Sequence, residues 1–314
     1  MGINSRRHFL QVSAAAAVAA SVPMNRLRGL DAGMASPVPA PKPMRLGLIV
    51  GIGKNPEAAI KKVHDLGVPS CQVGGLGPES LTPEIVSRLR TALDKYGIEA
   101  TSAVFGAPGP EVYDFYQGPE TIGFVPRKYR AARIEFTKKV SDFAKQLGIP
   151  AIQGHCGFIP ENPNNPLYKE TVEALREVAG YAKQNGQNFR YETGQETPIT
   201  MLRAIEDVGL DNQGINFDCG NLILYGKANP VDALDVIGKH VQGMHAKDGL
   251  YPTDPHKLGE EVAIGKGKAD FPRMIEKLRA LNYQGAVTIE REISGPQQLE
   301  DIRREKDYLE KLIG

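Results

Sequence analysis

Four residues in the C-terminal half of the chain could together bind a metal ion: Glu192, Asp218, His245 and Glu290. Each follows a short run of residues, and in the last three cases the run is apolar or β-favouring up to the ligand, as in a buried strand. Two glutamates, an aspartate and a histidine form a mixed oxygen and nitrogen set, which suits Mn²⁺, Mg²⁺, Co²⁺ or Zn²⁺ better than a soft thiolate site would. We expect one divalent metal ion, with Mn²⁺ as the first choice.

The spacing of these four residues indicates that they end successive strands of one sheet. The intervals are 218 − 192 = 26, 245 − 218 = 27 and 290 − 245 = 45 residues. The first two intervals fit one strand–helix–strand step each, and the third leaves room for a long loop besides. In a barrel of parallel strands the carboxyl ends converge on one rim, where such barrels carry their active sites. We therefore expect the four side chains to meet there.

The chemistry available to such a site is proton transfer at carbon. An ion that bridges the carbonyl and the neighbouring hydroxyl of a sugar stabilises the enediolate formed when a proton leaves carbon. Glu192 and Glu290 are the natural acid/base pair, because one can remove the proton and the other can return it, which gives epimerisation. If an acid instead protonates a leaving group on the adjacent carbon, the outcome is β-elimination, and the residues leave both courses open.

Three other residues are candidates for binding the substrate. His155 follows the predicted strand 150–153 and could hydrogen-bond a substrate hydroxyl or join the acid/base work, although a buried core histidine is the alternative. Lys247 follows His245 and could hold a substrate oxygen, or it could form a surface ion pair with Asp248. Lys266 lies between two glycines. The surrounding residues lack the strand–turn–helix context of a phosphate loop, so we favour a tight turn that places Lys266 near the substrate.

Two further polar residues, Gln72 and Glu292, have weaker claims to the site. Gln72 ends a predicted strand, and Glu292 shares the facing of Glu290 and could support the ligands. We interpret His64, inside an amphipathic helix, and His240, at the start of a strand, as structural.

An alternation of strands and helices positions these residues. Predicted strands are followed in turn by predicted helices, several of which begin at a proline after a capping residue and end at a glycine. The eight strands are 45–50, 69–73, 98–104, 150–153, 188–192 and the runs ending near 218, 245 and 290, and the eight helices are 56–66, 82–96, 127–147, 167–185, 197–208, 230–239, 270–281 and 297–312. This rhythm predicts an α/β fold, a single (β/α)8 TIM barrel over residues 44–314.

A long Gly/Pro-rich segment, 105–126, interrupts this rhythm after the third strand. Loops of this length are commonly functional. The aromatic residues Tyr113, Phe115, Tyr116 and Phe124 make it a candidate apolar lid, with an ordinary packed loop as the alternative.

The first residues resemble a twin-arginine export signal rather than part of the fold. Arg6 and Arg7 precede an alanine-rich, weakly apolar stretch and then a Pro- and Ala-rich spacer. We expect a signal peptide over 1–35, a flexible linker over 36–43 and a periplasmic protein. The alternative is a chance arginine pair near a flexible terminus.

Composition excludes several classes of function. The chain has 314 residues and a net charge of +1, so it lacks the basic excess of a nucleic-acid-binding protein. No run in the mature region is long and apolar enough to anchor the chain in a membrane. The three cysteines are far apart and offer no CxxC pair or disulfide framework. A small-molecule substrate is the expected partner, and a homo-oligomer remains open.

The chain resembles the xylose-isomerase-like sugar phosphate isomerase/epimerase superfamily, which includes ketose 3-epimerases, hydroxypyruvate isomerases, inosose dehydratases and type IV endonucleases. The resemblance covers essentially all of 44–314. Its most specific parts are Tyr191-Glu192-Thr193-Gly194, Asn216-Phe217-Asp218, His245-Ala246-Lys247-Asp248, Gly265-Lys266-Gly267 with Asp270-Phe271-Pro272, and Thr288-Ile289-Glu290-Arg291-Glu292. It implies a barrel with one divalent ion held by the four residues named first, and the two glutamates as the acid/base pair.

Two departures from the epimerase pattern bear on the reaction. Three residues after the metal aspartate, where the epimerases usually have a histidine, this chain has Asn221. Shortly after the metal histidine, where they tend to have an arginine, it has Lys247 and Asp248. We expect Asn221 to face the substrate.

These residues favour a metal-dependent isomerase or epimerase acting on a keto-sugar or polyol derivative. A lyase or dehydratase acting on a 3-keto-glycoside or inosose is the second hypothesis. A type IV endonuclease and a non-catalytic sugar-binding protein are distant alternatives.

Overall fold

A computed structural model describes residues 43–106 and 108–314 of the chain. The predicted signal peptide and nearly all of the predicted linker lie outside these residues. The strands are β1 (Arg45–Gly51), β2 (Ser70–Gly74), β3 (Glu99–Val104), β4 (Ala151–His155), β5 (Asn188–Glu192), β6 (Gln213–Asp218), β7 (Val241–Ala246), β8 (Asp248–Leu250), β9 (Glu260–Val262) and β10 (Ala286–Ile289). The α-helices are α1 (Pro56–Asp65), α2 (Pro83–Tyr96), α3 (Gly118–Thr121), α4 (Arg127–Gln146), α5 (Pro166–Gln184), α6 (Pro198–Val208), α7 (Cys219–Leu224), α8 (Pro230–Ile237), α9 (Phe271–Ala280) and α10 (Pro296–Ile313).

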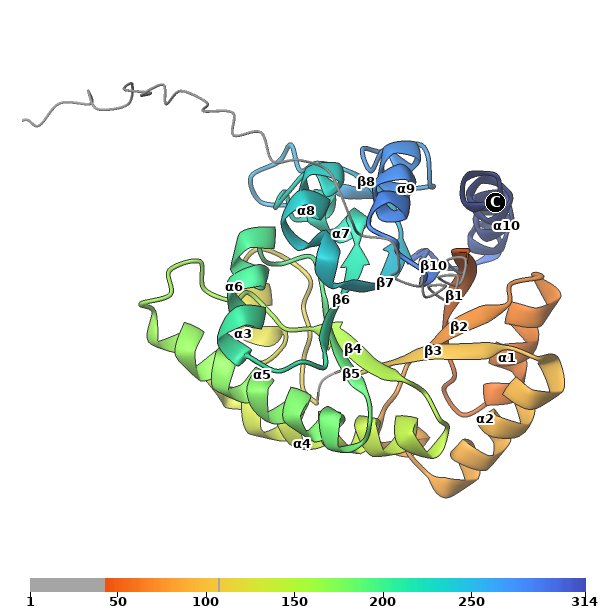
Figure 1. Ribbon diagram of the computed structural model, residues 1–314, viewed down its shortest axis with the longest axis horizontal. Coiled ribbons are helices and arrows are strands. Elements are labelled where there is room, and N and C mark those ends of the chain that lie inside the picture. The colour runs from red at the N-terminus through yellow and green to blue at the C-terminus, as the bar shows by residue number, and fades with distance from the viewer. Residues whose placement is uncertain (1–42, 107) are drawn as a thin grey trace, which may run out of the picture. The chain divides into compact units, whose positions relative to one another are not determined.

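The strands close into a parallel barrel in the order β1-β10-β7-β6-β5-β4-β3-β2, with helices around the outside (Figure 1). Register brings the ends of neighbouring strands level, so that Glu192 pairs with His155 on one side and Asp218 pairs with His245. The predicted (β/α)8 barrel is confirmed, and the eight predicted helices match α1, α2, α4, α5, α6, α8, α9 and α10 to within about two residues.

Local sequence explains why the helices begin and end where they do. Helix α2 begins after Thr82, whose side chain accepts the backbone N–H of Ile85, and a proline occupies its first turn. It ends at Gly97, which has a φ of 63° and therefore adopts the left-handed conformation that glycine tolerates best. Ile85, Val86 and Leu89 form its buried face, so the helix is fixed by packing as well as by its caps.

The structure adds elements that the strand–helix rhythm did not predict. Helix α7 begins directly after Asp218, which is its N-cap residue. The antiparallel hairpin β8–β9 follows β7 and takes up part of the 45-residue interval between His245 and Glu290. Both lie at the carboxyl ends of β6 and β7, on the rim where the predicted ligands end their strands.

The segment 105–126 divides into a buried part and an exposed part. Phe124 is 1% exposed and its ring packs against Phe105, so its assignment to a lid is wrong: it belongs to the hydrophobic core. Tyr113 and Tyr116 are exposed, and Phe115 packs edge-on against Tyr225. Only the portion around 113–116 therefore retains the features expected of a lid.

The structure also bears on the cysteines and on membrane-spanning helices. Cys71, Cys156 and Cys219 are all buried and free, so the absence of a disulfide framework is confirmed. None of the helices in the part of the chain that the structure describes is both long enough and apolar enough to cross a membrane.

Candidate metal centre and active site

The four predicted ligands meet at one point on the rim. One ligand atom from each of Glu192, Asp218, His245 and Glu290 lies within 4.8 Å of the others. Nδ1 of His245 is 3.1 Å from Oε1 of Glu192, 3.1 Å from Oε2 of Glu290 and 3.4 Å from Oδ2 of Asp218. Each ligand stands at or beside a strand end, those of β5, β6, β7 and β10, so it is the closure of the barrel that gathers them.

The state of the donor atoms fits a divalent cation. Nδ1 of His245 and Oδ2 of Asp218 are buried and have no hydrogen-bond partner among the described residues. On the other side of the imidazole, Nε2 lies 2.6 Å from Oε1 of Gln72. The amide oxygen can only accept, so Nε2 carries a proton, and Nδ1 is the nitrogen that faces the carboxylates and is free to bind an ion there. The residues present therefore suit a site for one divalent ion.

Asp218 is held by its own neighbours in the fold. Its Oδ1 accepts the backbone N–H of Asn221 at 2.7 Å, which caps helix α7 and leaves Oδ2 to face the other ligands. Its backbone N–H donates to Oγ1 of Thr193, and that hydroxyl donates to the Asp218 carbonyl, both at 2.8 Å. The residue after Glu192 thus ties the end of β5 to the end of β6.

Three carboxylates buried together create a strong demand for positive charge. Burial raises the pKa of Asp218 to about 7. Burial alone would also raise the pKa of Glu290, but His245 and Lys247 outweigh it and hold the pKa of Glu290 well below its usual range. Burial opposes protonation of His245, yet Glu290 and Glu192 raise its pKa well above the usual range. A divalent cation supplies the same neutralisation without a proton on His245.

Lys247 is a buried cation at the edge of this cluster. Its Nζ lies 3.2 Å from Oε2 of Glu290 and 2.5 Å from Oε2 of Glu292, and it donates to Oδ1 of Asn221 at 3.2 Å. The alternative of a surface pair with Asp248 is excluded, because Lys247 is 2% exposed and the Asp248 carboxylate accepts backbone N–H groups instead. The two departures from the epimerase pattern, Asn221 and Lys247, therefore contact each other.

The other two predicted substrate residues, His155 and Lys266, lie in different places relative to the ligands. Nε2 of His155 lies 3.7 Å from Oε1 of Glu192, and its Nδ1 is buried without a partner among residues 43–106 and 108–314. The ring of Tyr113 packs edge-on against His155, with 5.5 Å between centroids. Lys266 is exposed in a turn organised by Asp248, and no hydrogen bond or ion pair in the described residues joins it to the ligands.

Sequence reasoning gave little weight to Gln72 and did not find Glu196. Gln72 orients His245, and Gln153 donates to the same amide oxygen of Gln72 at 2.8 Å. Glu196 is 1% exposed and neither of its carboxylate oxygens has a hydrogen-bond partner in the described part of the chain. Burial raises the pKa of Glu196 to about 8. The signal for Glu196 was its position four residues after Glu192, beyond the strand end.

Comparisons with known proteins agree with this geometry. A xylose isomerase domain protein from Planctomyces limnophilus shares 36% identity and a TM-score of 0.81, over 86% of this chain and 97% of that one. A D-tagatose 3-epimerase-like protein shares the fold at 23% identity, with a TM-score of 0.64 over 86% and 98% of the two chains. The inosose dehydratase of Geobacillus thermodenitrificans is 24% identical over 75% of this chain and 82% of its own length. The family model described as xylose isomerase-like TIM barrel matches residues 60–312, and the chain therefore belongs to that family.

Proposed function

We propose that this chain is a divalent-metal-dependent isomerase or epimerase that acts on a keto-sugar or polyol derivative. The observation that carries the proposal is that two glutamates from different strand ends meet at one point. Glu192 and Glu290 each place a carboxylate oxygen 3.1 Å from the same nitrogen, Nδ1 of His245. Two bases that share one centre can approach a substrate carbon from two directions, which is what moving a proton from one face to the other requires.

The two glutamates have different surroundings and therefore different roles. A bound divalent ion would supply stabilisation of negative charge on the substrate oxygens. Glu192 has two imidazoles beside it, from His155 and His245, whereas Glu290 has the ammonium group of Lys247 at 3.2 Å. We assign removal of the proton from carbon to one carboxylate and its return to the other, with His155 as the group that passes a proton to or from Glu192.

The walls beside the ligands suit a polyhydroxylated substrate. Lys247 and Asn221 present a cation and an amide next to Glu290, so they can hold a substrate oxygen that becomes negative. Glu196 supplies a buried carboxyl that stays protonated at neutral pH, because burial raises its pKa to about 8, and it can then donate to a hydroxyl or carbonyl. Tyr113, from the 105–126 segment, packs edge-on against His155 and can contact a substrate bound beside it.

Isotope exchange tests the assignment directly. Metal-loaded protein is incubated in D₂O with ketoses, 3-keto-glycosides and inososes, and deuterium at carbon is measured by NMR. Glu192→Gln and Glu290→Gln should each lower the rate of turnover by about 10²–10⁴-fold, the usual loss of general acid–base catalysis, while metal content is retained. Glu84→Gln, on an exposed glutamate remote from the site, is the matched control. If both site variants exchange deuterium at the wild-type rate, the carboxylate pair is not the acid/base machinery.

A lyase or dehydratase is the second candidate, and Lys247 is the observation that favours it. Its ammonium group lies between Glu290 and Glu292, where a proton can be delivered to a leaving oxygen on the adjacent carbon. The similarity to an inosose dehydratase is consistent with this course. The same experiment separates the two reactions, because elimination gives an unsaturated product without return of the proton, and epimerisation gives deuterium at an inverted carbon.

A further inference from the structure

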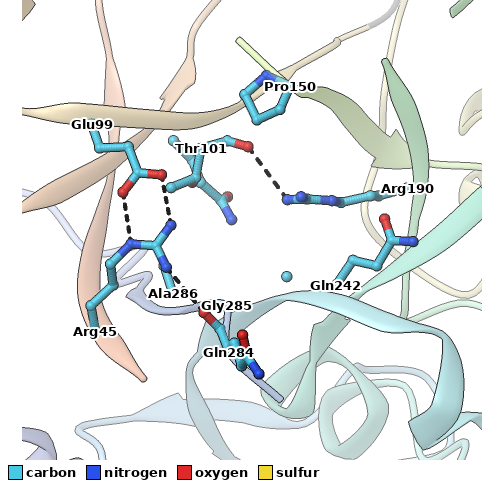
Figure 2. Close-up of a pocket in the computed structure, with 11 residues that line it drawn as sticks. Arg45, Glu99, Thr101, Pro150, Arg190, Gln242, Gln284, Gly285 and Ala286 are labelled. Atoms are coloured by element: carbon cyan, nitrogen blue, oxygen red, sulfur yellow. Dashed lines mark hydrogen bonds and ion pairs between the residues drawn. The ribbon is translucent and has the colours of Figure 1, made fainter. Parts of the chain in front are cut away.

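A second polar cavity lies at the opposite end of the barrel from the metal centre. It has a volume of about 100 Å³ and is lined mainly by residues at the amino-terminal ends of the strands. Figure 2 shows Arg45, Glu99 and Arg190 among these residues. Arg45 and Glu99 begin β1 and β3, and Arg190 projects from β5. The cavity is large enough for several water molecules or for one small tetrahedral ion. Because the chemistry of this family is carried at the other rim, the polar groups here need a separate explanation.

Arg190 is the unusual residue of this cavity. The residue is only 8% exposed, and its Nε is buried with no hydrogen-bond partner among the described residues. Its one hydrogen bond within the described residues is long, from Nη1 to the carbonyl of Thr101 at 3.5 Å. No carboxylate of residues 43–106 and 108–314 forms an ion pair with it, whereas Arg45 in the same cavity binds Glu99 through two bonds of 2.8 and 2.7 Å. A buried guanidinium without a counter-ion is costly.

The backbone around Arg190 is shaped to keep space for it. A Cβ added at Gly243 would lie 3.1 Å from Nη1 of Arg190, so the glycine leaves room for the guanidinium. Gly214 pairs with Arg190 in the sheet. The amide of Gln242 packs so closely on Gly214 that a Cβ added to this glycine would lie 2.4 Å from Oε1 of Gln242. Nε2 of Gln242 donates to the carbonyl of Gln213, which leaves Oε1 as a buried acceptor without a partner. Arg190 and Gln242 both line the cavity, so an unused donor and an unused acceptor belong to the same lining.

Charge and access also favour an anion. The charged residues that line the cavity are Arg45, Arg190 and Glu99, which sum to +2 − 1 = +1. An adjoining cavity of about 370 Å³ shares Arg190 and Gln242 and adds Lys239 to its lining. A small anion can therefore reach Arg190 through a neighbouring space of the same sign.

We propose that this cavity binds one small oxyanion that keeps a proton, with inorganic phosphate as the ligand of this class that fits best. The oxygens of phosphate accept from the guanidinium of Arg190, and its P–OH group donates to Oε1 of Gln242. Sulfate has the same shape but carries no proton at neutral pH, so it satisfies Arg190 and leaves Gln242 unpaired. Phosphate therefore binds more tightly than sulfate.

Equilibrium dialysis of the metal-loaded protein with labelled inorganic phosphate, at fixed ionic strength, tests this site. Wild-type protein should bind one phosphate per chain. Arg190→Met should weaken binding about tenfold or more through loss of charge-assisted hydrogen bonds. Gln242→Glu keeps the shape of the side chain and provides Arg190 with an internal carboxylate, so it should abolish phosphate binding and raise the Tm measured without phosphate. Arg88→Met, on an arginine already paired with Glu57, is the matched control.

Phosphate could also bind at the metal centre, and removal of the metal with a chelator distinguishes the two sites without changing Gln72, which lines the cavity and contacts His245. The metal-free protein should keep phosphate binding with unchanged affinity, and this result is independent of whether the proposed reaction is correct. Three results would overturn the proposal: no saturable phosphate binding by the wild-type chain, unchanged binding by the Gln242→Glu variant, or loss of phosphate binding together with the metal. The Gln242→Glu result still decides the question if Arg190→Met fails to fold.

Discussion

Replacement of Glu196 by glutamine should stabilise the protein, and by an amount that depends on pH. Glu196, four residues after Glu192, is 1% exposed, and burial raises its pKa from 4.5 to about 8. Below pH 4.5 the carboxyl is protonated in both the folded and the unfolded chain, so it adds no pH-dependent cost. Between pH 4.5 and 8 the unfolded chain releases the proton and the folded chain keeps it, so the free energy of unfolding falls as pH rises.

The size of this effect follows from the difference between the two pKa values. The difference is 8 − 4.5 = 3.5 units, and each unit corresponds to about 1.36 kcal/mol. The wild-type chain should therefore lose about 4–5 kcal/mol between pH 4.5 and pH 8, and about 3 kcal/mol of this by pH 7. Glutamine has nearly the same shape and does not titrate. The variant should consequently match the wild type near pH 4.5 and exceed it increasingly at higher pH.

Urea unfolding followed by circular dichroism, at a series of pH values, measures this difference. Both chains are measured with saturating Mn²⁺ and again with a chelator, because metal binding itself depends on pH and must cancel in the comparison. Glu84→Gln, on an exposed glutamate, should run parallel to the wild type. Identical pH profiles for wild type and the Glu196 variant would show that Glu196 is ionised in the folded protein, and the argument from its burial would be wrong. A stabilised variant that has lost turnover would show that Glu196 is retained for activity.

Three other predictions concern the metal centre and the first residues. His245→Ala should strip or greatly weaken the bound metal, because it removes the only imidazole of the ligand set, and elemental analysis showing full metal content would contradict the four-ligand site. Gln72→Leu should lower metal affinity about 10–100-fold through loss of the 2.6 Å contact with Nε2 of His245, as measured by competition with a fluorescent chelator; unchanged affinity would show that the amide does not orient the ring. Exchange of Arg6 and Arg7 for lysine should stop delivery to the periplasm, and fractionated cells with normal periplasmic protein would exclude a twin-arginine signal.

The sequence by itself determined the barrel and the four residues that cluster at its rim as possible metal ligands. Strand and helix periodicity, proline and glycine at helix ends, and ligands at strand ends are all local signals, and parallel closure turns a sequence rhythm into a shared rim. Helix α2 illustrates this, because Thr82 and Gly97 mark its ends in the sequence as clearly as in the structure.

The tertiary structure decided which polar residues face one another. Lys247 could have paired with Asp248 next to it in the chain, but barrel geometry directs it to Asn221 in α7 and to Glu290 after β10. Gln72 reaches His245 across 173 residues of sequence, and Glu196 is a candidate only because the fold buries its carboxylate without a partner among the described residues. Such contacts depend on the closure of the whole sheet, and neither spacing nor local propensity encodes them.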